Sequence, residues 1–237
     1  MLAYRIADVV INAEFRYDYS VKLLKDYAYC GKNKPDLVAV TTDEDIEFER
    51  RHGGETFPVY YLESLALFRK LSNYVLTSGK GFIFHCSALA VDGEAYLFAA
   101  PSGTGKSTHA ALWRKMLGDD RVTVINDDKP IVIEKADGFY AFGTPWTGKH
   151  RLGNNCSFKV KAVCNINRGT ENRIEKVSVG EMAPIFFNQT LRPENPAEMK
   201  KLIAMANRFL KSVDLYKLYC NVSPEAAKLS FHTMKGE

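Results

Sequence analysis

The sequence predicts a mixed α/β fold built around one sheet with helices on its flanks. Residues 82–91 and 94–99 form two apolar runs separated by Asp92-Gly93, a dipeptide typical of a tight β-hairpin. A glycine-bearing loop follows and leads into a helical run at residues 109–117. With 46% hydrophobic and 25% charged residues, the composition is that of an ordinary globular protein.

Residues 1–80 are predicted to form a small α+β region. Alternating apolar residues predict a strand over residues 4–11, and a second short strand is expected at residues 37–41. Ser20 is a candidate N-cap for a first helix. Apolar residues at helical spacing predict a second helix over residues 62–76.

Residues 81–237 are predicted to form the larger, sheet-based domain. Beyond the hairpin, strands are expected at residues 122–125, 131–134, 140–142, 158–166, 173–177 and 215–220. A helix is expected over residues 197–210, and a last one begins at Ser223-Pro224, with proline at its first position.

Charge and composition exclude several classes of function. The chain carries 32 basic and 28 acidic residues with the two signs mostly interspersed, which argues against a nucleic-acid partner. Its five cysteines form no CxxC pair, so neither a zinc site nor a disulfide framework is indicated, and a reducing, cytoplasmic location is expected. No apolar run approaches the roughly 20 residues that cross a bilayer, so no membrane partner is expected.

A phosphate-binding loop is the most specific motif in the chain. It fits the P-loop pattern, with alanine in place of the first glycine, and its expected nucleotide-binding residues are Ala100, Pro101, Ser102, Gly103, Thr104, Gly105, Lys106, Ser107 and Thr108. The glycines let backbone N–H groups turn toward phosphate oxygens, and the helix that follows adds its positive N-terminal dipole. The motif predicts ATP as ligand, with Lys106 on the phosphates and Ser107 on Mg²⁺.

An acidic pair follows the next apolar strand. Asp127 and Asp128 come about twenty residues after the loop, where an acidic residue at a strand end reaches the metal in P-loop enzymes. An Asp-Asp pair elsewhere is usually a polar turn. Here we expect Asp127 to bind Mg²⁺ and Asp128 to face the hydroxyl that receives the phosphate. His85 is a third candidate, although a histidine inside an apolar strand is more often a core side chain.

These elements together resemble the catalytic domain of HPr kinase/phosphorylase, a family of bacterial serine kinases related in fold to phosphoenolpyruvate carboxykinase. In that family a histidine, a hairpin, a phosphate loop and a strand ending in Asp-Asp follow one another, as His85, residues 100–107 and Asp127-Asp128 do here. The resemblance covers roughly residues 80–150. Residues 143–151 differ from the family's arginine-bearing signature, so the resemblance is to a divergent member.

The resemblance implies a P-loop core of this type, a mixed sheet with flanking helices, and a role for each site residue. Asp128 would take the proton from the acceptor hydroxyl, assisted and oriented by His85, and Lys106 would bind the phosphates. The family also favours a homo-oligomer. Residues 143–151 either form an exposed basic turn or place Arg151 as a clamp near the γ-phosphate.

The sequence thus predicts a Mg²⁺-dependent kinase that transfers the γ-phosphate of ATP to a hydroxyl, with a serine of a peptide or small protein as the expected acceptor. Two alternatives stay open: a small-molecule kinase on the same scaffold, and a nucleotide-binding regulatory module without transfer activity. The second carboxylate argues against the regulatory module, since binding alone does not require it.

Overall fold

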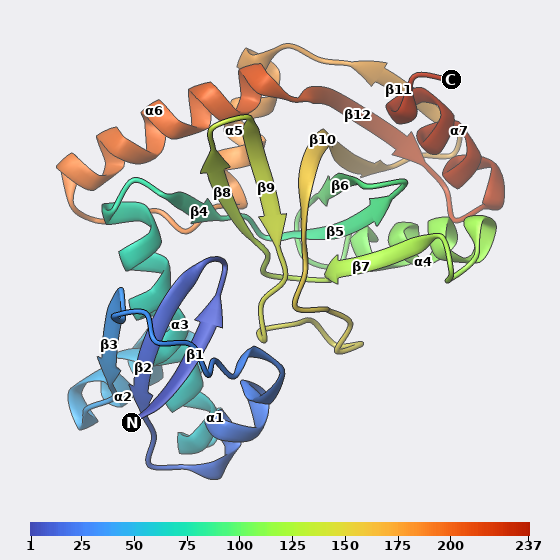
Figure 1. The fold of residues 1–237 in the computed structure, drawn as a ribbon. Coiled ribbons are helices and arrows are strands. Elements are labelled where there is room, and N and C mark those ends of the chain that lie inside the picture. The colour runs from blue at the N-terminus through green and yellow to red at the C-terminus, as the bar shows by residue number, and fades with distance from the viewer. The chain divides into compact units, whose positions relative to one another are not determined.

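A computed structural model describes residues 1–237, which divide into two compact units, Met1–Ser78 and Gly79–Glu237. The secondary structure of both is shown in Figure 1. No helix of the chain combines the length and the apolar character needed to span a membrane.

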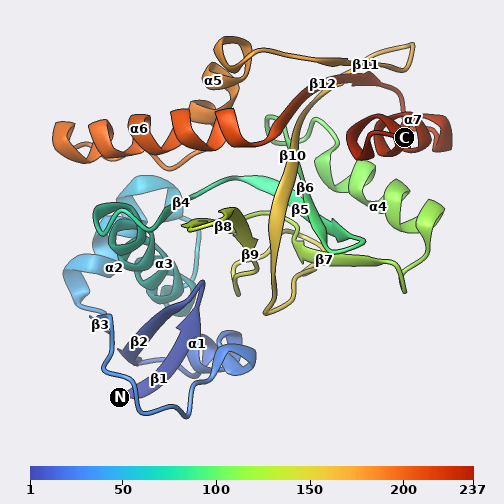
Figure 2. The same cartoon turned by 45° about the horizontal axis from the view of Figure 1, so that its top comes forward.

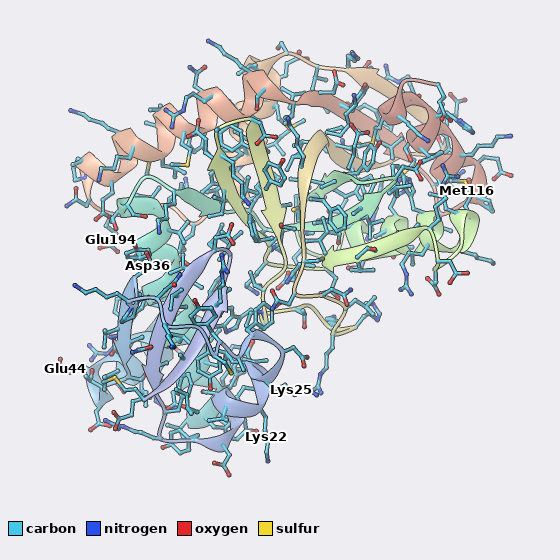
Figure 3. The ribbon with its side chains drawn as sticks, in the orientation of Figure 1. Lys22, Lys25, Asp36, Glu44, Met116 and Glu194 are labelled. Atoms are coloured by element: carbon cyan, nitrogen blue, oxygen red, sulfur yellow. The ribbon has the colours of Figure 1, made fainter.

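The first unit contains a three-stranded sheet and three helices. Strand β1 (Leu2–Ile6) pairs antiparallel with β2 (Val9–Glu14), which pairs parallel with β3 (Leu37–Val40). The helices are α1 (Asp18–Leu23), α2 (Asp43–Glu49) and α3 (Val59–Thr77), with short helical turns at Lys25–Tyr27 and Arg50–Gly54. Asp36, labelled in Figure 3, holds β3 beside β2, because its backbone N donates to Val10 O and its carboxylate accepts from Val10 N.

Two sequence predictions are wrong in this unit. The single strand expected at residues 4–11 is a hairpin, because Ala7 and Asp8 turn the chain with φ of 49° and 58°. Neither residue is a glycine, so the sequence carries no turn signal there. Ser20 is not an N-cap; it is buried inside α1, where its hydroxyl donates to Glu63 Oε2 at 2.7 Å.

The second unit is built on a nine-stranded mixed sheet. Its strands are β4 (Gly81–Ile83), β5 (Cys86–Val91), β6 (Glu94–Ala99), β7 (Val122–Asn126), β8 (Ile131–Lys135), β9 (Gly138–Phe142), β10 (Ser157–Arg168), β11 (Arg173–Lys176) and β12 (Asp214–Cys220). They lie in the order β4-β8-β9-β10-β6-β5-β7, and β12 pairs with both β10 and β11. The structure is therefore mixed α/β, as predicted.

Four helices flank this sheet: α4 (Lys106–Leu117), α5 (Val179–Asn188), α6 (Pro196–Ser212) and α7 (Pro224–Lys235). Helices α4 and α7 lie side by side in both views (Figures 1 and 2). The fully buried Trp113 of α4 joins them to the sheet, since its ring packs edge-on against Phe98 of β6 and Phe231 of α7. This packing fixes the direction in which α4 leaves the loop before it.

Strand directions bring one set of strand ends to a common edge. Strands β10 and β12 run parallel to each other and to β6. Strand β5 runs antiparallel to both β6 and β7, so β6 and β7 also share a direction. The carboxyl ends of β6 and β7 and the start of β5 therefore meet at one edge of the sheet, which is where open α/β sheets bind their ligands.

The strand expected at residues 82–91 is broken in two. Its first part, β4, pairs with β8, whereas its second part, β5, pairs with β6 and β7. Between them Phe84 N donates to Pro130 O at 3.2 Å and His85 N donates to Gln189 O at 2.7 Å. These two backbone bonds carry the chain from one part of the sheet to the other and place His85 at the break.

Candidate functional site

The phosphate-loop motif forms a turn between β6 and α4. Its two glycines adopt backbone angles that side chains disfavour, with φ of 78° at Gly103 and 124° at Gly105. Gly105 is also the N-cap of α4, a helix of 12 residues, so the N–H groups of its first turn have no partner within the helix and face the loop. This geometry fits an anion at the start of α4.

Lys106 lies directly over this loop. The side chain is buried, and its Nζ donates to Ala100 O at 2.7 Å. Burial lowers the pKa of the Lys106 ammonium, and nearby charges, that of Asp128 among them, oppose the shift. The loop and the carboxylate site are therefore close enough to interact electrostatically.

Asn126 builds the turn that carries the acidic pair, and sequence analysis did not single it out. Its side chain is fully buried at the end of β7, where Oδ1 accepts from Asp128 N at 2.8 Å and from Lys129 N at 2.6 Å. Its Nδ2 donates to Thr144 O at 3.0 Å. One amide thus shapes the acidic turn and ties it to the following loop. The only sequence signal was an asparagine directly before two aspartates.

The Asp127 carboxylate is buried, and only one of its two oxygens has a hydrogen-bond partner. Its Oδ1 accepts from Gly148 N at 2.5 Å, while its Oδ2 is inaccessible and has no hydrogen-bond partner. A buried carboxylate oxygen without a partner is costly unless a cation neutralises it. Asp127 also lines one cavity together with Ser107. The two residues expected to bind Mg²⁺ therefore face a shared space, and the orphaned oxygen fits a cation.

Protein ligands alone do not complete a metal site here, because no cluster of three or more His, Cys, Asp or Glu side chains could hold an ion.

His85 and Asp128 form a hydrogen-bonded dyad beside Asp127. His85 Nε2 lies 2.9 Å from Asp128 Oδ1, and Lys129 Nζ donates to the other oxygen, Oδ2. Burial raises the pKa of the Asp128 carboxyl, but the bonds from His85 and Lys129 outweigh burial and bring the pKa to about 2. Asp128 is therefore ionised at any physiological pH.

Gln189 is a further residue that sequence analysis missed. It follows α5, far from the dyad in sequence, and its amide nitrogen can donate to Ala100 O at 3.0 Å and to His85 Nδ1 at 3.3 Å. A donor at Nδ1 leaves the ring proton on Nε2, which then donates to Asp128. Nothing in the local sequence marks this residue, because its role depends on the β4–β5 break.

Two cavities flank the start of α4. The first, of about 550 Å³, contains Ser107, Asp127 and His150. The second, of about 340 Å³, lies between the loop and the ends of β10 and β12. Arg168 closes part of its wall, with Nη2 donating to Gly103 O at 2.6 Å.

The structure gathers most of the predicted site residues at one sheet edge: the loop residues 100–108, His85, Asp127 and Asp128. Arg151 is the exception. It lies in a third cavity beside β7 and does not line the one with Ser107 and Asp127. His150, its neighbour, occupies that place instead.

Comparisons with known proteins find a distant structural similarity but no match in sequence. No protein-family model matches the chain, and no curated protein matches it in sequence. A solved structure, the Hpr(Ser) kinase/phosphatase from Coxiella burnetii, is similar with a TM-score of 0.34 and 10% identity, over 65% of this chain and 93% of that chain. The likeness between the two structures is distant.

Proposed function

We propose that the chain is a Mg²⁺-dependent phosphotransferase that moves the γ-phosphate of ATP to a hydroxyl, with serine of a peptide or small protein as the acceptor. One observation carries the proposal: a phosphate loop, a buried carboxylate with an orphaned oxygen, and a His85–Asp128 dyad meet at one sheet edge. Nucleotide binding alone needs only the first of these.

The loop and Lys106 would hold the phosphates of ATP at the start of α4. The cavity of about 340 Å³ beside Gly103 and Thr108 offers room for a nucleoside next to them, which favours a nucleotide over pyrophosphate as donor. Ser107 and Asp127 would hold Mg²⁺, which neutralises charge on the phosphates when bound.

In the transfer step the acceptor oxygen forms a bond to the γ-phosphorus, the bond from that phosphorus to the bridging oxygen of ADP breaks, and the hydroxyl proton passes to Asp128. A pKa of about 2 makes Asp128 a weak base. That suffices here, because in a loose phosphoryl-transfer transition state the attacking hydroxyl must be oriented more than it must be deprotonated. His85 and Lys129 keep the carboxylate ionised and fixed for this purpose.

Two variants test the proposal. Lys106→Ala removes a charge-assisted contact of about 1.5–3 kcal/mol, so calorimetry should show ATP binding at least about tenfold weaker. Asp128→Asn keeps the shape but removes the negative charge that orients the hydroxyl and finally takes its proton, so transfer from labelled ATP should fall steeply while ATP binding persists. Equal ATP affinity in Lys106→Ala and the parent would refute the nucleotide site. Normal phosphate transfer by Asp128→Asn would show that the acidic pair is only a polar turn with no role in transfer.

A further inference from the structure

Two adjoining cavities form one groove beside strand β7. The cavity of about 550 Å³ begins at Ser107 and Asp127. A cavity of about 420 Å³ continues it past Val122 and Thr123. The two share three lining residues, Arg114, Val124 and Leu152, so they lie next to each other along the strand, with the phosphate loop at one end.

Strand β7 is the last strand of its sheet. It pairs with β5 on one side. On the other side residues 152–154 cover its carboxyl-terminal half, because Asp127 N donates to Leu152 O at 3.1 Å, Asn154 N donates to Ile125 O at 3.1 Å and Asn154 Nδ2 donates to Val124 O at 2.8 Å. Val122 and Thr123, which line the groove beyond this segment, are the part of the edge that an extended peptide could meet. The five residues of β7 span about 17 Å, so a groove that follows the strand has the length of an extended peptide more than that of a compact metabolite.

One part of the lining near the phosphate loop is apolar. Leu89, Ala110 and Val124 are buried around it, and Leu152 closes its outer wall. Ala110 and Ala111 leave space on the α4 side of the groove, because any larger side chain there would fill it. This part suits an apolar side chain next to the hydroxyl-bearing residue.

The far half of the groove carries uncompensated positive charge. Arg114 is neutralised there by Asp119, whose Oδ1 lies 2.9 Å from Arg114 Nε. Arg151 is exposed and its guanidinium forms no ion pair. Lys149, two residues earlier in the chain, is also exposed and forms no salt bridge, although it lines neither cavity. An acidic side chain is the complement that this charge favours.

We therefore propose that this groove binds the phosphate acceptor as an extended peptide, with an apolar residue beside the serine and an acidic residue several positions away. The inference rests on the proposed function, and it assigns Arg151 to acceptor recognition instead of the γ-phosphate.

A positional scan of serine-centred peptides tests the peptide and its sequence. With the full-length chain and labelled ATP, peptides that carry an apolar neighbour and a Glu should be phosphorylated with kcat/KM about tenfold or more above matched peptides with Lys in place of Glu. Calorimetric ATP binding is measured in parallel. Intact ATP binding with transfer only to small hydroxyl compounds would overturn the peptide groove and leave the kinase standing. Loss of ATP binding and of all transfer would overturn the proposed function itself.

Variants locate the binding surface. Ala111→Tyr fills the groove from α4, so the KM for the best peptide should rise about tenfold while ATP affinity stays unchanged. Lys115→Tyr is the matched control, because Lys115 is exposed on the same helix but lines no part of the groove. Arg151→Glu should reverse the preference from Glu to Lys in the peptide. Unchanged KM in Ala111→Tyr together with an unchanged preference in Arg151→Glu would show that the acceptor binds elsewhere.

Discussion

Asp127 and Asp128 are adjacent in sequence but differ in almost every physical respect. Asp127 is buried, held by a backbone N–H, and has an oxygen without a partner. Asp128 has a partner on each oxygen, His85 Nε2 on Oδ1 and Lys129 Nζ on Oδ2. A single buried amide, that of Asn126, sets the turn between them. Divided roles for the pair therefore have a structural basis.

The depressed pKa of Asp128 makes stability depend on pH. Its folded pKa of about 2 lies below the ordinary value of 3.8, so the dyad stabilises the fold above about pH 3.8 and this contribution is lost as pH falls toward 2. Urea unfolding of the parent should lose more free energy between pH 4.5 and 2.5 than Asp128→Asn does. Comparing the two variants removes the effect of other carboxylates. Identical losses would show that the dyad does not form in solution.

Gln189 should act as a positioning residue through His85. We expect Gln189→Leu to lower kcat by roughly tenfold to a hundredfold, as loss of orienting partners does elsewhere, with ATP affinity unchanged. If Gln189 had only a structural role, its loss would not change the tautomer of the His85 imidazole. ¹⁵N NMR of His85 therefore distinguishes the two roles. The Nε2-protonated form should dominate in the parent and lose its preference in the variant. An unchanged tautomer with lowered kcat would contradict the positioning role.

At the scale of elements, the start of α4 depends on a glycine that no other residue replaces well. Gly105 has φ of 124°, so Gly105→Ala should cost about 1–3 kcal/mol of unfolding free energy and weaken ATP binding with it. Gly180→Ala is the matched control, since Gly180 lies in the first turn of α5 without a positive φ and should be neutral or slightly stabilising. Urea unfolding and calorimetry measure both. Equal stability of the two variants would rule out backbone strain at the loop.

Elements with strong local signals were predictable from the sequence. The Asp92-Gly93 hairpin, the loop entering α4 and the proline-led helix α7 all follow from residues that favour one backbone conformation. Helices α2 and α5 were also signalled, by capping boxes at Thr42/Asp45 and Ser178/Glu181, but were not predicted.

What could not be predicted depends on tertiary contacts. The break at Phe84 and His85 exists because Pro130 O and Gln189 O accept their N–H groups, and both partners are distant in sequence. For the same reason His85 could be predicted as a candidate from the sequence, whereas Gln189 could not. Arg151 was predicted from its guanidinium group and from the glycines of its loop, whereas its place in the third cavity depends on how residues 148–154 follow the edge of β7.

For the whole molecule, the two compact units suggest that the site belongs to one of them. Every residue assigned to it lies within residues 79–237. We expect a fragment of these residues to unfold cooperatively and to bind ATP with the affinity of the full chain. Calorimetry on the fragment, with its Lys106→Ala variant as negative control, measures this. A fragment that is folded but does not bind ATP would show that residues 1–78 contribute to the nucleotide site.

The hydrogen bond from Gly148 N to Asp127 bears on how fast the proposed kinase would hydrolyse ATP with water in place of an acceptor. The same loop supplies His150 and Leu152 to the wall of the proposed acceptor groove, so one hydrogen bond links that wall to the carboxylate proposed to hold Mg²⁺. Buried polar groups that are only partly satisfied depend on their neighbours for a single arrangement. For the proposed kinase we therefore expect hydrolysis of ATP by water to be slow until an acceptor fills the groove, which would spare ATP when no acceptor is present.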